Sequence, residues 1–331
     1  AMKNEEIDVA LIGCGRIAGH HCRSIVAAKG VKLTAVCDLV EEKAAAYGKE
    51  FGVPHFVNYR EMLERNPWIN VVAVITPSGM HYEHAMEMLS LYKKNIIVEK
   101  PTFMRPSQLK EAYALAGKLG LHIFPVFQNR YNIAVQRVRK ALQSGELGKV
   151  RIAAVRVRWC RPQRYYELAP WRGTYAQDGG ALTNQGIHHI DLLRNLVGDI
   201  KKVSAAMRTL GADIEVEDSA VATIAYEAGT IGVLEVTTSA RPIDFEASIS
   251  LVCEKGLAQI GGIAVNELQI FTPEPAACAA CSEDFSGNVY GNGHGEMYKD
   301  IASFWYRDVP YPVSENDCFG TIKLLHAFYR S

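Results

Sequence analysis

Near the start of the chain, residues 7–18 read IDVALIGCGRIA, so that an apolar run leads directly into two closely spaced glycines. The run Ile7–Ile12 predicts a short buried strand of a parallel sheet. Gly13 and Gly15 follow at once, and a helical pattern begins at Arg16. A strand, a glycine turn and a helix in this order predict the first unit of a doubly wound α/β fold that binds a dinucleotide.

Each small residue of this Gly-x-Gly-x-x-Ala motif has a separate physical role. Gly13 permits the tight turn, Gly15 lets the backbone approach a pyrophosphate, and Ala18 keeps the helix close to the strand. The unpaired N–H groups at the start of the helix, where Arg16 and Ile17 lie, are expected to face the phosphates. The sequence therefore predicts that Gly13, Gly15, Arg16 and Ile17 bind the cofactor.

An acidic residue after the next predicted strand refines the choice of cofactor. The strand covers residues 32–37 and ends at Asp38, which lies 23 residues after Gly15. A carboxylate at this place accepts hydrogen bonds from the ribose hydroxyls of adenosine and repels a 2′-phosphate. Leu39 and Val40 follow and supply no arginine for such a phosphate. The prediction is NAD rather than NADP.

The pattern of strands and helices divides the chain into two domains. Strands and helices alternate up to about residue 144, which is typical of βαβ units around a parallel sheet. Beyond residue 150 several strands follow one another, with one predicted helix at 180–197 and two more at 295–305 and 315–329. We predict an N-terminal Rossmann domain, residues 1–127, and a C-terminal α+β domain, residues 128–331. The second domain is expected to hold a large, mostly antiparallel, open-faced sheet, and the terminal helix to pack back on the first domain.

Composition excludes several classes of protein. The chain has 36 basic and 36 acidic side chains and a formal net charge of zero, which argues against a nucleic-acid partner. The sequence contains no uncharged apolar run of about 18 residues, so no membrane span is predicted. The polar, acidic residues 1–6 are unlike a signal peptide, and eight scattered cysteines fit reduced thiols, so we expect a cytoplasmic protein. Cys278 and Cys281 have ligand spacing but no second pair, so no metal site is predicted.

The tripeptide Glu99-Lys100-Pro101, after the predicted strand 95–98, resembles the Gfo/Idh/MocA family of oxidoreductases. Further marks of the resemblance are Thr76-Pro77-Ser78 with His81, and the sequence QNRY at residues 128–131. The resemblance covers essentially the whole chain and implies an NAD-dependent dehydrogenase that acts on a CH–OH group. It also implies that the cofactor contacts Thr76, Pro77, His81, Glu99, Lys100 and Gln128, although a histidine such as His81 at a helix start is more often structural.

The same resemblance implies the catalytic groups. In this family the lysine of the tripeptide lies beside the nicotinamide and the substrate hydroxyl, which implies that Lys100 polarises that oxygen. The family's aspartate four residues before a catalytic histidine corresponds here to Asn184 and His188, a spacing that puts both on one helical face. An amide is not a base, so we expect Asn184 to orient substrate and His188 to accept the proton. His189 is expected to pack elsewhere, and Asp191 either to bond near His188 or to form a helix salt bridge.

An arginine- and tyrosine-rich loop narrows the substrate. Residues 158–172 read RWCRPQRYYELAPWR and, with residues 178–185, resemble the UDP-N-acetylglucosaminuronate 3-dehydrogenase subgroup. The family implies cofactor contacts by Trp171 and Arg172. Arginine binds carboxylate or pyrophosphate bidentately and tyrosine offers a stacking face, which favours substrate contacts by Arg158, Arg164 and Tyr165. The family resemblance implies that Lys100, Asn184, His188 and His294 also contact the substrate. The alternative for each arginine is a solvated charge on the loop, and the alternative for His294 is to cap the helix that follows it.

The resemblance therefore implies oxidation at C3 of a nucleotide-linked sugar acid, within the biosynthesis of bacterial surface polysaccharide. Three alternatives remain open at this point: a dehydrogenase of a free sugar or inositol, an NAD-dependent glycosidase, and a non-catalytic regulator that binds NAD. The expected apolar face of the second sheet predicts a homodimer or homotetramer.

Overall fold

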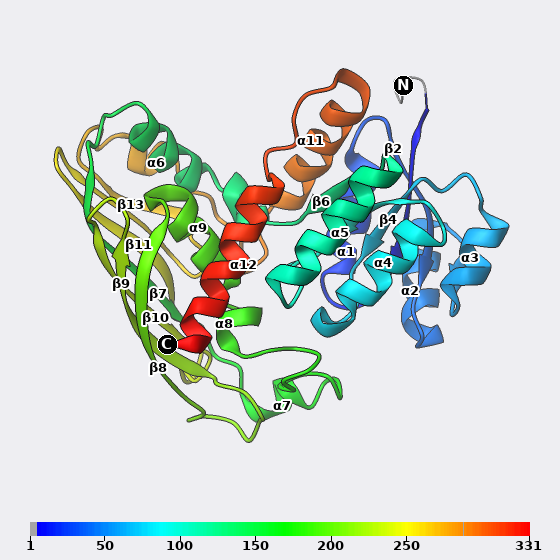
Figure 1. The fold of residues 1–331 in the computed structure, drawn as a ribbon, viewed down its shortest axis with the longest axis horizontal. Helices are drawn as coiled ribbons and strands as arrows, with labels where there is room; N and C mark the ends of the chain where they lie inside the picture. Colours follow the sequence, from blue (N-terminus) through cyan, green and yellow to red (C-terminus); the bar gives the residue numbers. More distant parts are fainter. Residues whose placement is uncertain (1–4, 287) are drawn as a thin grey trace. The chain divides into compact units, whose positions relative to one another are not determined.

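The computed structural model describes residues 5–286 and 288–331 (Figure 1). The first four residues of the polar N-terminal stretch lie outside the described part. The chain divides into two compact units, one of Ala1–Val126 with His294–Phe319 and the other of Phe127–Gly293 with Gly320–Ser331. The first boundary lies within one residue of the predicted one. We predicted residues 128–331 as the second domain, with the terminal helix packing back on the first domain. The segment His294–Phe319 instead belongs to the first unit.

The first unit is built on a six-stranded parallel sheet with strand order β3-β2-β1-β4-β5-β6. The strands are β1 (Ile7–Ile12), β2 (Val31–Cys37), β3 (His55–Phe56), β4 (Val71–Val74), β5 (Asn95–Val98) and β6 (Ile123–Pro125). The order of strands reverses between β1 and β4, and in such sheets ligands bind beyond the carboxyl ends of the strands at this switch point. The glycine motif after β1 and Thr76 after β4 both lie at this edge.

Helices on the first unit are α1 (Ala18–Ala27), α2 (Glu41–Phe51), α3 (Tyr59–Arg65), α4 (His81–Ser90), α5 (Pro106–Leu119) and most of α11 (Gly293–Arg307). The boundary between the two units falls inside α12 (Glu315–Arg330). The sequence patterns missed β3 and α3, which are short. The Asn58 side chain accepts hydrogen bonds from the N–H groups of Arg60 and Glu61 and so begins α3, a capping signal that the hydrophobic period does not contain.

The second unit holds a seven-stranded sheet with strand order β13-β12-β11-β7-β10-β9-β8. The strands are β7 (Val150–Arg158), β8 (Ile200–Arg208), β9 (Ser219–Tyr226), β10 (Ile231–Thr237), β11 (Glu246–Cys253), β12 (Leu257–Gly261) and β13 (Glu267–Phe271). β10 pairs with β7 in parallel and the other neighbours pair antiparallel, which confirms the mostly antiparallel sheet. Its helices are α6 (Ile133–Gln143), α7 (Gln163–Tyr166), α8 (Ala181–Asn184), α9 (Ile187–Val197) and α10 (Ala277–Ala280).

The two faces of this second sheet differ in character. Along β7, Ala153, Val155 and Val157 are buried, whereas Ile152 on the opposite face is 46% exposed. Figure 1 shows α8 and α9 on the same side of the sheet, and they contact β7, β9 and β10. The alternation along β7 therefore separates a covered face from an open face, as the period of two predicts.

One predicted helix is interrupted in the structure. The sequence pattern predicts a single helix over residues 180–197, but the structure has α8 and α9 separated by a turn at Gln185 and Gly186. A Cβ at Gly186 would lie 3.2 Å from a methyl carbon of Val236 and 3.3 Å from the backbone of Leu182. Close packing at this turn therefore favours glycine, and the turn places Asn184 and His188 on different helices.

Among the residues that the structure describes, every helix is too short or too polar to cross a membrane.

Candidate functional site

The glycine turn after β1 has the geometry that a dinucleotide site needs. Gly13 has φ +99°, and a Cβ added there would lie 2.4 Å from the carbonyl oxygen of Ile75. Its N–H donates to the carbonyl of Cys37 at 2.8 Å. A Cβ at Gly15, by contrast, would have no atom within 4 Å. The turn is therefore closed on the sheet side at Gly13 and open at Gly15, where a pyrophosphate has room to approach.

Asp38 lies at the end of β2 with its carboxylate fixed by two backbone groups. One oxygen accepts from the N–H of Cys14 and the other from the N–H of Val40, each at 2.8 Å. Each oxygen keeps a second acceptor position for a ribose hydroxyl. Arg16 is exposed and Ile17 half-buried in the turn before α1, which begins at Ala18, two residues later than predicted.

The loop after β4 contains Thr76, Pro77 and, at the start of α4, His81. The ring nitrogens of the buried His81 lie 2.8 Å from the carbonyl oxygen of Thr76 and 3.0 Å from that of Thr102. Burial lowers the pKa of His81 to about 4, so the ring is neutral and donates to one of these oxygens at a time. This position favours the structural role over cofactor contact for His81. Thr76 and Pro77 are half-buried at the carboxyl edge of the sheet.

Lys100 lies in a tight turn directly after β5. The N–H of Thr102 donates to the carbonyl of Glu99 at 3.0 Å and closes the turn. Thr102 has φ +72° and is fully buried. A β-branched residue in this region is strained and persists only where the surroundings hold it in place. The half-buried Lys100 therefore lies in a turn whose last residue, Thr102, is strained and fully buried.

Glu99 is surrounded by groups of its own unit. One carboxylate oxygen lies 2.6 Å from Nε2 of His21 and 3.1 Å from Nε2 of His294, and the other accepts from the N–H of Lys100 at 3.1 Å. Burial by itself raises the pKa of Glu99, but hydrogen bonds from the two histidines outweigh it and hold that pKa well below the usual range. The structure thus argues against the predicted cofactor contact by Glu99 and the predicted substrate contact by His294, which is 1% exposed. Sequence analysis missed the role of His21.

In the second unit, α9 carries His188 and His189. His188 is buried and lies edge-on to the Phe127 ring at 6.2 Å between ring centroids. His189 is fully buried against the Trp159 ring, at 5.5 Å, which confirms the packing expected of it. On α8, Nδ2 of Asn184 donates to Asp178 at 2.6 Å. The buried Asp178 also accepts from the N–H of Gly173 at 2.7 Å, so this carboxylate fixes the orientation of the Asn184 amide.

A buried ion pair anchors the start of the second unit to α9. Arg130 donates through Nε and Nη2 to the two oxygens of Asp191, both at 2.8 Å. Thr321 also donates to Asp191 at 2.7 Å. Of the two roles left open for Asp191, the structure shows a salt bridge, although the partner is 61 residues away and not on the same helix.

The arginines of the loop differ in their surroundings. Arg172 donates to the hydroxyl of Tyr165 at 2.6 Å and stacks on Trp171, 4.7 Å from its ring centroid. Arg164 is exposed on α7. Arg158 bonds to Glu235 of β10 through both Nε and Nη2 and lies on the open face of the sheet, opposite Trp159. This position argues against the predicted substrate contact by Arg158.

Gln128, in the short 3-10 helix Gln128–Tyr131, is buried, and its side-chain oxygen accepts no hydrogen bond from any described residue. An unsatisfied buried acceptor is costly unless a ligand or water supplies a donor. The side-chain oxygen of Gln128 is therefore available to a donor group of a ligand.

These features define a two-domain oxidoreductase with a dinucleotide-binding Rossmann domain. Residues 7–127 match the model of an oxidoreductase family with an NAD-binding Rossmann fold, and residues 135–259 match the GFO/IDH/MocA C-terminal domain. The chain belongs to the Gfo/Idh/MocA family, as the Glu-Lys-Pro tripeptide predicts, and it is an NAD-dependent enzyme.

The names of individual relatives give particular ligands or reactions. The chain is similar to the WlbA dehydrogenase from Bordetella pertussis in complex with NADH and UDP-GlcNAcA, with a TM-score of 0.92 and 32% identity over 99% of this chain and 96% of that one. The WlbA dehydrogenase of Chromobacterium violaceum, in complex with the same two ligands, has a TM-score of 0.89 and 31% identity over 99% and 94%. D-glucoside 3-dehydrogenase of Escherichia coli (strain K12) is 28% identical over 261 residues, which is 72% of each chain.

Proposed function

We propose that this chain oxidises C3 of a nucleotide-linked sugar acid such as UDP-N-acetylglucosaminuronate, with NAD⁺ as the oxidant. The observation that carries the proposal is the similarity along nearly the whole chain to a dehydrogenase crystallised with NADH and this sugar nucleotide. Two other relatives, D-glucoside 3-dehydrogenase and glucose-6-phosphate 3-dehydrogenase, carry in their names the same position of oxidation. They support C3 as the reacting carbon.

In the proposed reaction, His188 accepts the proton of the C3 hydroxyl and the Lys100 ammonium stabilises the negative charge that develops on the same oxygen. When bound, the cofactor would supply the acceptor for the C3 hydrogen and its electron pair, so that the overall products are a ketone, NADH and a proton. Gly13, Gly15, Arg16, Ile17, Asp38, Thr76, Pro77, Gln128, Trp171 and Arg172 are the residues proposed to hold the cofactor.

Substrate recognition is assigned to the second unit. Asn184, held by Asp178, is proposed to orient the sugar. Arg164 and Tyr165 are proposed to contact the carboxylate or the pyrophosphate, because a guanidinium binds such groups through two parallel hydrogen bonds and a tyrosine ring offers a stacking face. An uncharged polyol does not need these cations, which favours the sugar nucleotide over inositol.

We further propose that the enzyme acts in the bacterial cytoplasm, in the synthesis of amino sugars for surface polysaccharide. Its eight cysteines are all free, which fits a reducing compartment. We also propose assembly into a homodimer or homotetramer through the open face of the second sheet.

The test is the absorbance of NADH at 340 nm when purified protein meets NAD⁺ and UDP-N-acetylglucosaminuronate, with a keto acid added in a parallel run to reoxidise bound NADH. NADH formation, or a 3-keto sugar that depends on the keto acid, supports the proposal. The variant His188→Asn is expected to lose about 10²–10⁴-fold in kcat, as removal of a general base does. Activity only with a free sugar, an inositol or a glycoside, or NAD binding without any turnover, would overturn it in favour of the corresponding alternative.

A further inference from the structure

Behind the turn that carries Lys100 lies a buried chain of polar side chains, which we call the Glu99 cluster: His21, Glu99, His294 and Tyr298. They come from α1, the end of β5 and α11, and their exposed fractions are 0%, 6%, 1% and 0%. All four belong to the first unit. Burying this many polar groups is costly unless they bond to one another, so their arrangement requires an explanation.

The hydrogen bonds of the Glu99 cluster lead to the main chain of Lys100. One oxygen of Glu99 is shared by the two histidines, and the other accepts from the N–H of Lys100 at 3.1 Å. Nδ1 of His21 lies 2.7 Å from the hydroxyl of Tyr298. A neutral His21 with its proton on Nε2 donates to Glu99 and accepts from Tyr298, an assignment that satisfies both nitrogens.

We propose that His21 and His294 are positioning residues, which hold the Glu99 carboxylate so that it fixes the backbone at Lys100. The proposal rests on the proposed function, in which Lys100 acts on the substrate hydroxyl. Glu99 is adjacent to Lys100 in sequence, and its carboxylate accepts a hydrogen bond from the Lys100 N–H at 3.1 Å. Loss of the histidine donors frees this carboxylate to rotate away, and the turn loses its restraint at the residue that must be aligned.

The same donor set could in principle hold a metal ion, because one nitrogen or oxygen of His21, Glu99 and His294 lies within 4.8 Å of the others. Ligand atoms at the usual distances around a tetrahedral zinc are about 3.3 Å apart. The 2.6 Å between His21 and Glu99 is instead a hydrogen-bond length, and the Tyr298 hydroxyl completes the chain. The geometry therefore favours the hydrogen-bonded cluster, and metal content becomes an outcome of the test.

The first test does not depend on turnover. Hydrogen exchange at the Lys100 amide is measured in the NAD⁺-saturated protein and in the variants Glu99→Gln, His21→Leu and His21→Gln. The matched control is His122→Leu, a half-buried histidine of the same unit that packs on Phe304 and not on Glu99. Exchange is expected to rise about tenfold in Glu99→Gln and His21→Leu. It is expected to stay near the wild-type rate in His21→Gln, whose amide replaces the Nε2 donor, and in the control.

The second test is a double-mutant cycle on kcat. His21→Leu is expected to lower kcat about 10²-fold while KM for NAD⁺ changes less than about threefold, and to have no further effect in the Lys100→Ala background. Costs that add in the double variant, unchanged exchange at Lys100, or one zinc ion per chain in the purified protein would each overturn the proposal. Full activity of Lys100→Ala would instead overturn the proposed function, and the exchange experiment would still decide whether the cluster fixes this backbone.

Discussion

Gly13 and Gly15, the two glycines of the phosphate turn, differ in what a side chain at each position would contact. At Gly13 a Cβ would collide with the backbone at Ile75 and the residue would also have to hold φ +99°. At Gly15 a Cβ would meet nothing within 4 Å, so the fold itself accepts a side chain there and the open space is available to a bound ligand. Fold and function thus place separate demands on two residues of one motif.

This difference gives a prediction at the residue scale. Gly13→Ala is expected to lower the free energy of unfolding by more than about 1 kcal/mol, because alanine is strained at positive φ. Gly15→Ala is expected to leave that free energy unchanged or slightly higher and to weaken NAD⁺ binding at least about tenfold, or ~1.4 kcal/mol. Urea unfolding and calorimetric titration with NAD⁺ measure the two quantities. Unimpaired NAD⁺ binding by Gly15→Ala would contradict the proposed approach of the pyrophosphate.

A buried histidine makes the second unit sensitive to acid. Burial lowers the pKa of His189 to about 4, so this ring stays neutral in the folded chain while the unfolded chain takes up a proton below about pH 6.5. The contribution of the neutral His189 ring to the free energy of unfolding is fully present above pH 6.5 and is lost as pH falls toward 4. The loss amounts to about 3 kcal/mol for a shift of this size.

Unfolding by urea at a series of pH values between 7 and 4 tests this prediction. The slope of the unfolding free energy against pH is expected to be smaller in His189→Phe, which keeps an aromatic ring against Trp159 but does not titrate. The same substitution at the exposed His55 serves as the control and should leave the slope unchanged. An equal slope in wild type and His189→Phe would contradict the neutral state of this ring.

At the scale of elements, the ion pair of Arg130 and Asp191 joins the 3-10 helix Gln128–Tyr131 to α9. Both side chains are buried, and two parallel hydrogen bonds connect them. Removal of one partner of a buried pair leaves the other charge uncompensated, which typically costs 3–5 kcal/mol.

Asp191→Ala is therefore expected to destabilise the chain by about 3–5 kcal/mol. The midpoint of thermal or urea unfolding measures the effect. Glu61→Ala, which breaks the exposed pair of Glu61 with Arg65, is the matched control and should leave the midpoint in place. A similar midpoint for Asp191→Ala and wild type would show that this pair does not anchor α9.

Local signals predicted most elements and failed where distant contacts decide. Strands β11 and β13 have the predicted bounds because their residues alternate and turn residues flank them. The break between α8 and α9 was not predicted, and the close approach of Val236 to Gly186, 50 residues away in sequence, is a contact that no local pattern contains. The parallel pairing of β10 with β7 is likewise a long-range choice that no local period contains.

The candidate site shows the same limit. Motifs predicted the glycine turn, Asp38 and the turn at Lys100, each of which follows a strand directly. The Glu99 cluster was not predicted, because Glu99 and His294 are 195 residues apart and their contact depends on the return of α11 to the first unit. The position of Arg158 on the open face was not predicted, because a strand presents only alternate side chains to one face and the sequence does not say which face α9 covers.

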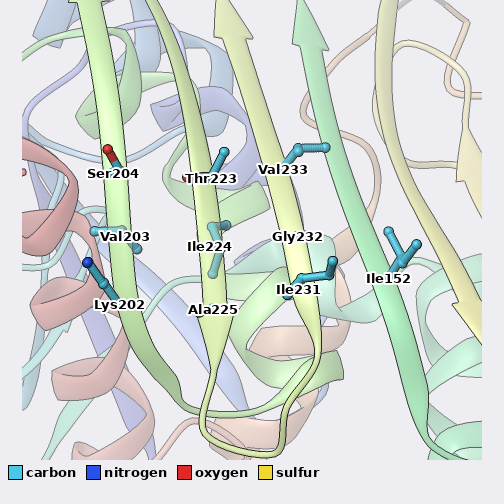
Figure 2. A pocket seen from close by; sticks show the side chains of 10 residues that line it. All are labelled: Ile152, Lys202, Val203, Ser204, Thr223, Ile224, Ala225, Ile231, Gly232 and Val233. Carbon is cyan, nitrogen blue, oxygen red and sulfur yellow. The ribbon is translucent and has the colours of Figure 1, made fainter.

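At the scale of the whole molecule, the open face of the second sheet predicts self-association. Ile152, Ile231 and Val233 lie on the neighbouring strands β7 and β10 (Figure 2) and are 46%, 59% and 48% exposed. Val221 on β9 adds a fourth side chain, 58% exposed. Exposed apolar side chains grouped on one face of a sheet favour burial against a second copy.

Ile231→Lys is accordingly expected to shift the protein from an oligomer to a monomer, as measured by light scattering after size-exclusion chromatography. Leu168→Lys, at an equally exposed apolar residue outside the sheet, is the control and should keep the wild-type mass. A monomeric wild type, or an unchanged mass in Ile231→Lys, would contradict assembly through this face.

We propose that the C3 hydrogen of a nucleotide-linked sugar acid passes to NAD⁺ in this enzyme. The most direct measurement uses UDP-N-acetylglucosaminuronate deuterated at C3 and follows the label by mass spectrometry of the nicotinamide and the sugar. We expect one deuterium in the reduced nicotinamide and a sugar that has lost that deuterium and one hydroxyl proton. Label retained in the sugar, or reduced cofactor without label, would contradict it.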